Sequence, residues 1–177
     1  MGTPPIHAGI LIGIDWGLRR VGLSISDPTQ TLSRPLEILE REGHDLELGP
    51  SDEKILDVLA NRIKENDVKS LVFGVPYYHV SGDPNPHAGI FLQAGRAIGE
   101  RLGVSVIFFD EGQTSERARE LAPKKKRKSH RKVYCDDVAA GLLLQGFLDE
   151  SAANRGSFSQ KDDEGDWVSL ERSASGR

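Results

Sequence analysis

The sequence predicts a single α/β domain with a mixed five-stranded sheet flanked by helices, and three observations support this prediction. The chain has 177 residues, which is enough for one well-buried core and short of the usual length for two. Strand-like patterns fill the first part of the chain, and helical and strand-like patterns then alternate in the expected order βββαβαβα. Residues 151–177 are rich in Ser, Asp and Gly, so we expect a domain over 1–150 followed by a disordered tail.

Three strands are expected at the start of the chain. Residues 7–15 form a short apolar run that ends in Asp15. Residues 19–27 alternate apolar side chains with Gly and Ser, which is the period of a half-buried strand. Pro35, inside the third candidate strand over 31–40, indicates an edge strand or a β-bulge. A loop is expected to follow over 41–50.

The first helix and the fourth strand come next. Ser51 is expected to cap a helix that runs to about Asn66, with Asp52 and Glu53 favourable in its first turn. The continuous apolar run 70–76 ends at a proline and predicts a buried strand.

The remaining elements follow from turn residues and apolar runs. Asn85 and Pro86 indicate the start of a second helix, and Gly103 indicates its end. The later patterns predict a strand over 104–111, a short helix over 114–121 and a final apolar helix over 136–150.

Charge is distributed unevenly along the chain. The net charge is −4, yet one short segment carries seven positive charges and no acid, which leaves −11 for the rest of the chain. Such a segment can dock on a phosphate backbone, although a solvated loop or a nuclear-localisation-like signal has the same composition. Its basic residues are Lys124, Lys125, Lys126, Arg127, Lys128, Arg131 and Lys132.

Several classes of protein are disfavoured. The single cysteine, Cys135, excludes an internal disulfide and suits a reducing cytosol, so we expect a cytoplasmic protein. No apolar stretch approaches the roughly 20 residues of a membrane helix. The N-terminus has no basic region before its apolar run, so no signal peptide is expected.

Acidic residues stand at the ends of several predicted elements. Asp15 and Glu111 end apolar strands, and Asp136 and Asp137 precede the last helix. Each of them alone can be a turn or cap residue. Together they can converge on one cleft, where a divalent cation would neutralise them. Hard oxygen ligands favour Mg²⁺ or Mn²⁺ over zinc.

These motifs match a known family. The run GIDWGLRRVGLSISD (13–27) resembles the opening GxDxGxxRxGxAxSD signature of the YqgF/RuvX family. The segments 71–76, 108–115 and 128–149 resemble its later blocks, so the resemblance covers about residues 8–150. It implies an RNase H-like fold similar to that of RuvC-type Holliday junction resolvases. It also implies a nuclease that processes the 5′ end of pre-16S ribosomal RNA.

The resemblance implies roles for particular residues. Asp15, Glu111 and Asp136 would be the catalytic and metal-binding acids, with Asp137 at a position where the family usually has serine. One or two Mg²⁺ (or Mn²⁺) ions would assist phosphodiester hydrolysis. Arg19, Arg20 and the basic segment would hold flanking phosphates of precursor rRNA.

The chain also departs from the family pattern. Gly112 stands where arginine is usual and Gln113 where leucine is usual, and the segment 77–82 is one residue longer.

Three other functions remain open at this point. A Holliday junction resolvase-like DNase would use the same acids, and RuvC-type resolvases act as dimers, so either a monomer or a homodimer is compatible with the sequence. A non-catalytic nucleic-acid-binding ribosome-assembly factor would keep the basic segment without cleavage. Asp15 followed by Gly17 also resembles the first phosphate loop of actin-like and sugar-kinase ATPases, which close two such domains around ATP.

Overall fold

The structure is a computed structural model that describes residues 9–43, 45–78, 83–110 and 132–153, without the side chains of 132–138. In these ranges the elements follow the order β1, β2, β3, a short 3₁₀ helix η1, α1, β4, α2, β5 and α4. The predicted α/β class and the order βββαβαβα are therefore confirmed. None of the described helices has the length and apolar character that a membrane crossing requires.

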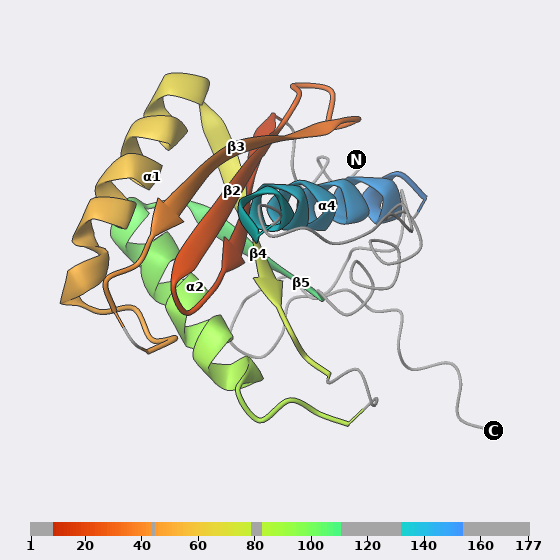
Figure 1. Cartoon of the computed structure of the whole chain (residues 1–177). Helices are drawn as coiled ribbons and strands as arrows, with labels where there is room; N and C mark the ends of the chain where they lie inside the picture. Colours follow the sequence, from red (N-terminus) through yellow and green to blue (C-terminus); the bar gives the residue numbers. More distant parts are fainter. Residues whose placement is uncertain (1–8, 44, 79–82, 111–131, 154–177) are drawn as a thin grey trace.

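Five strands form one mixed sheet in the order β3-β2-β1-β4-β5 (Figure 1). The first three strands are antiparallel neighbours, and β4 and β5 run parallel to β1. The carboxyl ends of β1, β4 and β5 consequently meet at one edge of the sheet. The strands are β1 (Ile10–Trp16), β2 (Arg20–Ser26), β3 (Ser33–Glu40), β4 (Val68–Val75) and β5 (Ser105–Asp110).

Helices cover both faces of this sheet. Helices α1 (Glu53–Asn66) and α2 (Ala88–Leu102) pack on one face, and α4 (Lys132–Ala153) lies across the other (Figure 1). The α1/α2 face buries the larger core, which includes Trp16 and Phe73. The α4 face buries a smaller cluster of Leu11, Val72, Ile107, Phe109, Leu143, Leu144, Phe147 and Leu148. In β1, β4 and β5, period-2 alternation sends successive apolar side chains to opposite faces and so supplies both clusters.

Several boundary residues behave as predicted. The β3 strand lies at a sheet edge, and its register with β2 shifts next to Pro35, as expected for a bulge. Gly103 ends α2 with a left-handed φ of +64°, and its N–H donates to the carbonyl of Gly99. The predicted end of this helix is therefore confirmed.

Two predicted helix starts were wrong. Ser51 lies inside η1 (Pro50–Asp52), and α1 begins at Glu53 with Asp52 as its cap position. Asn85 does not cap α2, which begins at Ala88; its side chain instead accepts a hydrogen bond from the His87 N–H at 2.9 Å. In both places a tight turn precedes the helix, and the predicted cap residue belongs to that turn. The helix therefore begins later than cap preferences predict.

The last helix is longer than predicted. It begins at Lys132 and ends at Ala153, so it extends beyond the 136–150 range in both directions. The predicted short helix over 114–121 and most of the expected tail lie outside the described residues.

Candidate active site

Asp15 lies near the carboxyl end of the central strand β1, on the face that α4 covers. Its partner in β2 is Gly22, and Gly13, two residues earlier in β1, pairs with Ser24. A Cβ placed on Gly13 would lie 2.8 Å from Cβ of Leu144 in α4. Since residues two apart in a strand share a face, the Asp15 carboxylate projects toward the side of α4. The side chain is half-buried.

The residues directly beside Asp15 in the two flanking strands are glycines. Gly22 lies opposite Asp15 in β2. In β4, Phe73 pairs with Ile14, so Gly74 stands at the level of Asp15. Neither of these two positions adds side-chain bulk next to the carboxylate.

Helix α4 is held over β2 and β3 by hydrogen bonds. The Ser24 hydroxyl donates to the carbonyl of Ala140 at 2.8 Å, and the Ser33 hydroxyl donates to that of Gly141 at 2.5 Å. The Ser33 N–H donates to Oε1 of Gln145 at 2.8 Å. These bonds tie residues 140–145 of the helix to two strands and define its position over the sheet.

The same bonds define the direction in which α4 runs. Gln145 donates to the carbonyl of Thr31, which precedes β3, whereas Gly141 lies against Pro35, the β3 partner of Ser24. Going toward its amino end, α4 therefore passes along β2 from Ser26 to Ser24. This is the direction in which β1 approaches Asp15, so the first turns of α4 point to the end of β1 that carries this acid.

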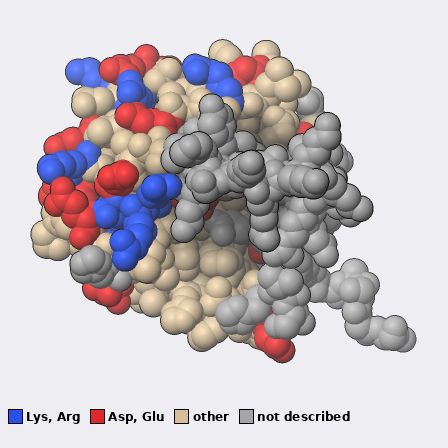
Figure 2. Space-filling model, in the orientation of Figure 1, with Lys and Arg blue, Asp and Glu red and all other residues tan. Residues whose placement is uncertain are grey.

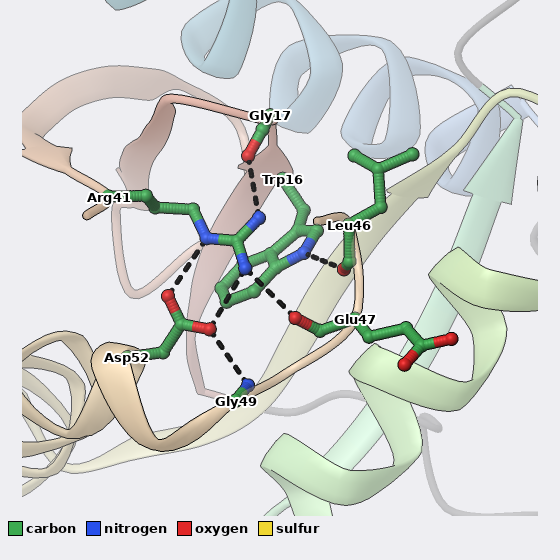
Figure 3. A network of polar contacts seen from close by, with 7 residues as sticks. All are labelled: Trp16, Gly17, Arg41, Leu46, Glu47, Gly49 and Asp52. Carbon is green, nitrogen blue, oxygen red and sulfur yellow. Dashed lines mark hydrogen bonds and ion pairs between the residues drawn. The ribbon is translucent and has the colours of Figure 1, made fainter. Parts of the chain in front are cut away.

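A buried arginine holds the turn that follows Asp15 (Figure 3). Arg41 donates from Nε and an NH2 nitrogen to both oxygens of Asp52, each at 2.9 Å. It also donates to the carbonyls of Gly17 and Glu47, each at 3.0 Å. Its guanidinium lies 4.2 Å from the centre of the Trp16 ring. We call these residues the Arg41 cluster, and planar bidentate pairing is the geometry that suits a buried arginine.

The cluster also organises the loop before η1. The Trp16 indole N–H donates to the carbonyl of Leu46 at 2.7 Å, and the Gly49 N–H donates to Asp52 at 3.0 Å. Burial raises the pKa of Asp52, but the hydrogen bonds from Arg41 and Gly49 and the charge of Arg41 outweigh it. The pKa of this carboxyl therefore lies below its ordinary value of 3.8, so Asp52 is ionised at neutral pH.

Two of the predicted phosphate contacts lie beside Asp15. Arg19 is exposed in the turn between β1 and β2. Arg20 is half-buried, begins β2 opposite Glu40 of β3 and shares a face with Gly22 and Ser24. Both arginines therefore stand at the same end of the sheet as Asp15.

The described surface that faces the viewer in Figure 2 carries both positive and negative side chains. Figure 2 shows Lys and Arg interspersed with Asp and Glu on the side of the molecule where α1 and β3 lie. Charged residues of α1 and β3 and their neighbours form ion pairs, such as Arg62 with Glu37 at 3.0 Å and Lys54 with Glu42 at 3.2 Å. This visible side thus offers no uniformly basic surface for a phosphate backbone.

The other predicted site residues lie partly or wholly outside the residues that the structure describes. Asp136 and Lys132 belong to the backbone of α4, but their side chains are not described. Glu111 follows the last residue of β5 and lies outside the described residues, as do Gly112, Gln113 and the basic residues within 124–131. Among the described residues, no group of three or more His, Cys, Asp or Glu side chains is placed to hold a metal ion.

Sequence patterns missed the residues that support Asp15. Local patterns predict a loop at Arg41 and the first turn of a helix at Asp52, yet the two form a buried pair. They predict only a polar position of an alternating strand at Ser24, although its hydroxyl holds α4. The buried position of Arg41 (6% exposed) depends on contacts with residues far along the chain, which no local pattern contains.

Comparisons with known proteins agree with the resemblance in the sequence. A protein from Lactococcus lactis subsp. cremoris (strain MG1363), named "Putative pre-16S rRNA nuclease", is 32% identical over 143 residues, which cover 80% of this chain and 95% of that protein. A protein of the same name from Roseiflexus sp. (strain RS-1) is 31% identical over 142 residues, covering 80% and 94%. Among solved structures, T. thermophilus RuvC in complex with a Holliday junction substrate is 17% identical, covers 81% of this chain and 96% of that one, and has a TM-score of 0.49.

A family model covers nearly all of the described fold. The RuvX model, described as Holliday junction resolvase, matches residues 9–150. This range includes Asp15, Glu111 and Asp136 together with the full sheet and most of α4. The chain therefore belongs to the RuvX family.

Proposed function

We propose that this nuclease is a metal-dependent endonuclease that processes the 5′ end of pre-16S rRNA. Membership of the RuvX family and identity of 31–32% to relatives named as pre-16S rRNA nucleases support hydrolysis of phosphodiester bonds. The substrate, the catalytic residues and the site of action in the cytoplasm are our proposal. The matched regions cover 80% of this chain and 94–95% of those relatives. The proposal therefore concerns the nuclease domain as a whole.

The observation that carries the proposal is the approach of α4 to Asp15. Ala140 is anchored at Ser24, and Asp136 stands four residues earlier in the helix, which is about 6 Å along its axis. Gly22, the partner of Asp15, stands two residues before Ser24 in β2, which is about 7 Å along the strand. Both steps lead toward the end of the sheet that carries Asp15, and their lengths are similar. The backbone at Asp136 is thus expected to lie over Gly22 and Asp15.

The third proposed acid, Glu111, follows the parallel strand β5 in the chain. In β5, Ile107 and Phe109 belong to the cluster under α4, and Glu111 is two residues beyond Phe109 in the chain. Because β5 and β1 run parallel through β4, their carboxyl ends share one edge of the sheet. We propose that Glu111 completes a set of three acids with Asp15 and Asp136.

The residues present fit a divalent cation with hard oxygen ligands. The proposed donors are all carboxylates, and the glycines beside Asp15 add no bulk next to its carboxylate. Asp15, Glu111 and Asp136 would hold Mg²⁺ or Mn²⁺. When bound, such an ion activates water and stabilises developing charge on phosphate oxygens. Arg19, Arg20 and the basic residues 124–132 would bind flanking phosphates, which would position the scissile bond at the acids.

A resolvase-like DNase is the second candidate function, because the family model itself is described as Holliday junction resolvase. Four-way junctions have two-fold symmetry, so that activity would require a homodimer. The rRNA activity has no such requirement.

The test compares three labelled substrates in Mg²⁺ and in Mn²⁺. These are a precursor fragment spanning the 5′ end of 16S rRNA, a single-stranded RNA of the same length and a four-way DNA junction. Preferential cutting of the precursor is expected. Preferential cutting of the junction would transfer the assignment to the DNase, and binding without cutting of any substrate would indicate an assembly factor.

A further inference from the structure

We propose that the turn from Gly17 to Arg20 is a preformed contact surface for the nucleic-acid strand that enters the active site. In this proposal Leu18 packs on a sugar or base of that strand and Arg19 binds an adjacent phosphate. The inference rests on the proposed nuclease function. It adds Leu18, and the Arg41 cluster behind it, to the residues that determine how substrate binds.

The first observation is that the backbone of this turn is held on both sides. The Gly17 N–H donates to the carbonyl of Arg20 at 2.9 Å, which closes the turn. A Cβ on Gly17 would lie 2.7 Å from that same carbonyl oxygen, so the turn is too tight for any other residue. The N–H of Arg41 donates to the carbonyl of Arg19 at 2.8 Å.

The second observation is that a buried ion pair supports the turn from below. The Arg41 side chain donates to the Gly17 carbonyl and to Asp52, and it stacks on Trp16 (Figure 3). Removing one partner of such a buried pair is strongly destabilising, and the four hydrogen bonds of the Arg41 side chain define one arrangement. The arrangement that Arg41 imposes is the path of the turn immediately after Asp15.

The third observation is what this rigid turn presents to solvent. Leu18 is 46% exposed, and its neighbour Arg19 is exposed as well. Leu18 is three residues from Asp15 at the end of the sheet where the acids are expected. An apolar side chain next to a cation matches a nucleic-acid strand, in which sugars and base faces alternate with phosphates. A rigid turn makes this contact at low entropic cost.

A second exposed leucine provides the matched control. Leu32 is 66% exposed and lies in the turn between β2 and β3, at the opposite end of β2 from Arg20. That turn is held by Asp27, which accepts hydrogen bonds from the N–H groups of Thr31 and Leu32 at 2.7 and 2.8 Å. It is therefore also ordered and carries an exposed leucine, but it lies far along β2 from Asp15.

The experiment compares Leu18→Ser with Leu32→Ser in the full chain. Affinity for a fluorescent RNA precursor fragment is measured by anisotropy over a range of salt concentrations, and KM and kcat are measured on the same fragment. Leu18→Ser is expected to weaken binding and raise KM by about five- to tenfold, because serine buries less apolar surface against the RNA. Its salt dependence should stay that of the unmodified protein, since every phosphate-binding cation is still present. Leu32→Ser should change neither quantity.

Arg19→Gln distinguishes the phosphate contact of Arg19 from the apolar contact of Leu18. It should lower the slope of log affinity against log salt by roughly 0.7 to 0.9, the value for one phosphate. Equal affinity of Leu18→Ser and the unmodified protein, or equal weakening in Leu32→Ser, would overturn the proposal. Absence of cleavage in the unmodified protein would refute the nuclease function alone, because the anisotropy comparison still decides whether Leu18 contacts RNA.

Discussion

At the scale of single residues, the Arg41–Asp52 pair explains how the turn after Asp15 is held. Its two side chains are essentially inaccessible to water, at 1% and 0% exposure, with an N–O distance of 2.9 Å. Every donor that Arg41 uses reaches a carboxylate or carbonyl oxygen. Removing one partner would therefore leave a buried charge without compensation, which costs far more than removing one partner of a surface pair.

Asp52→Asn is expected to lower the free energy of unfolding by about 3–5 kcal/mol, because the guanidinium of Arg41 stays buried beside a neutral amide. Urea denaturation followed by circular dichroism measures this decrease. Glu42→Gln is the control, since Glu42 pairs with Lys54 in an exposed position and should change stability little. Equal stability of the two variants would show that the Arg41 pair does not hold the loop.

The same carboxylate predicts a pH dependence. The pKa of Asp52 is lower in the folded state than its ordinary 3.8, so the unfolded chain binds a proton first as pH falls. The resulting stabilisation is complete above pH 3.8 and is lost as pH falls through the lowered pKa. Urea denaturation midpoints should therefore fall less steeply between pH 6 and pH 2.5 in Asp52→Asn than in the unmodified protein. Parallel curves for the two proteins would contradict this role.

At the scale of elements, the position of α4 on the sheet depends on small residues in β1 and β2. Gly13 has no room for a side chain, because a Cβ there would lie 2.5 Å from Oγ of Ser24 and 2.8 Å from Cβ of Leu144. The helix can therefore approach β1 closely only while this position is glycine. Since α4 carries Asp136, its height over β1 should affect catalysis as well as stability.

Gly13→Ala is expected to destabilise the fold by about 1–3 kcal/mol through overpacking and to lower kcat more than it raises KM. The physical reason is displacement of α4, and with it Asp136, from Asp15. Thermal denaturation and steady-state kinetics measure the two effects. Gly89→Ala in α2 is the control, because a Cβ there meets nothing within 4 Å and should be neutral or slightly stabilising. Unchanged kcat in Gly13→Ala would contradict the proposed placement of Asp136.

The elements show which structural features a sequence can predict. Strand alternation, the bulge at Pro35 and the stop at Gly103 depend on each residue's own backbone preferences, so local patterns predicted them correctly. The helix start was wrong at Ser51 because Asp52 pairs with Arg41, eleven residues earlier. That contact exists only after β3 and η1 have packed together. The family motif predicts a catalytic role for Asp15, whereas the contacts of Ser24 and Arg41 near it came only from the structure.

At the scale of the whole molecule, positive charge is concentrated in one segment of the chain. The segment 124–132 carries seven positive charges, and the rest of the chain is acidic. Binding of a phosphate backbone should therefore depend on this segment far more than on the mixed charges around α1.

Replacing Lys124, Lys125 and Lys126 by Gln should weaken RNA binding and reduce its salt slope by up to about 0.9 for each phosphate that is no longer neutralised. Anisotropy titrations at several salt concentrations measure the slope. The control replaces Lys54, Lys64 and Lys69, three exposed lysines of α1 and β4. The net charge changes equally in both triple variants, so equal slopes would show that the basic segment is not the docking site.

Cleavage of the labelled rRNA precursor by Asp15→Asn and Asp136→Asn tests the proposed active site. Asp149→Asn is the control, since Asp149 is exposed near the far end of α4 and accepts a hydrogen bond from Gln145. We expect cutting that requires Mg²⁺ or Mn²⁺, that is abolished in both site variants while RNA binding persists, and that is retained in the control. Cutting by Asp15→Asn at the rate of the unmodified protein would contradict the assignment of this acid to the active site.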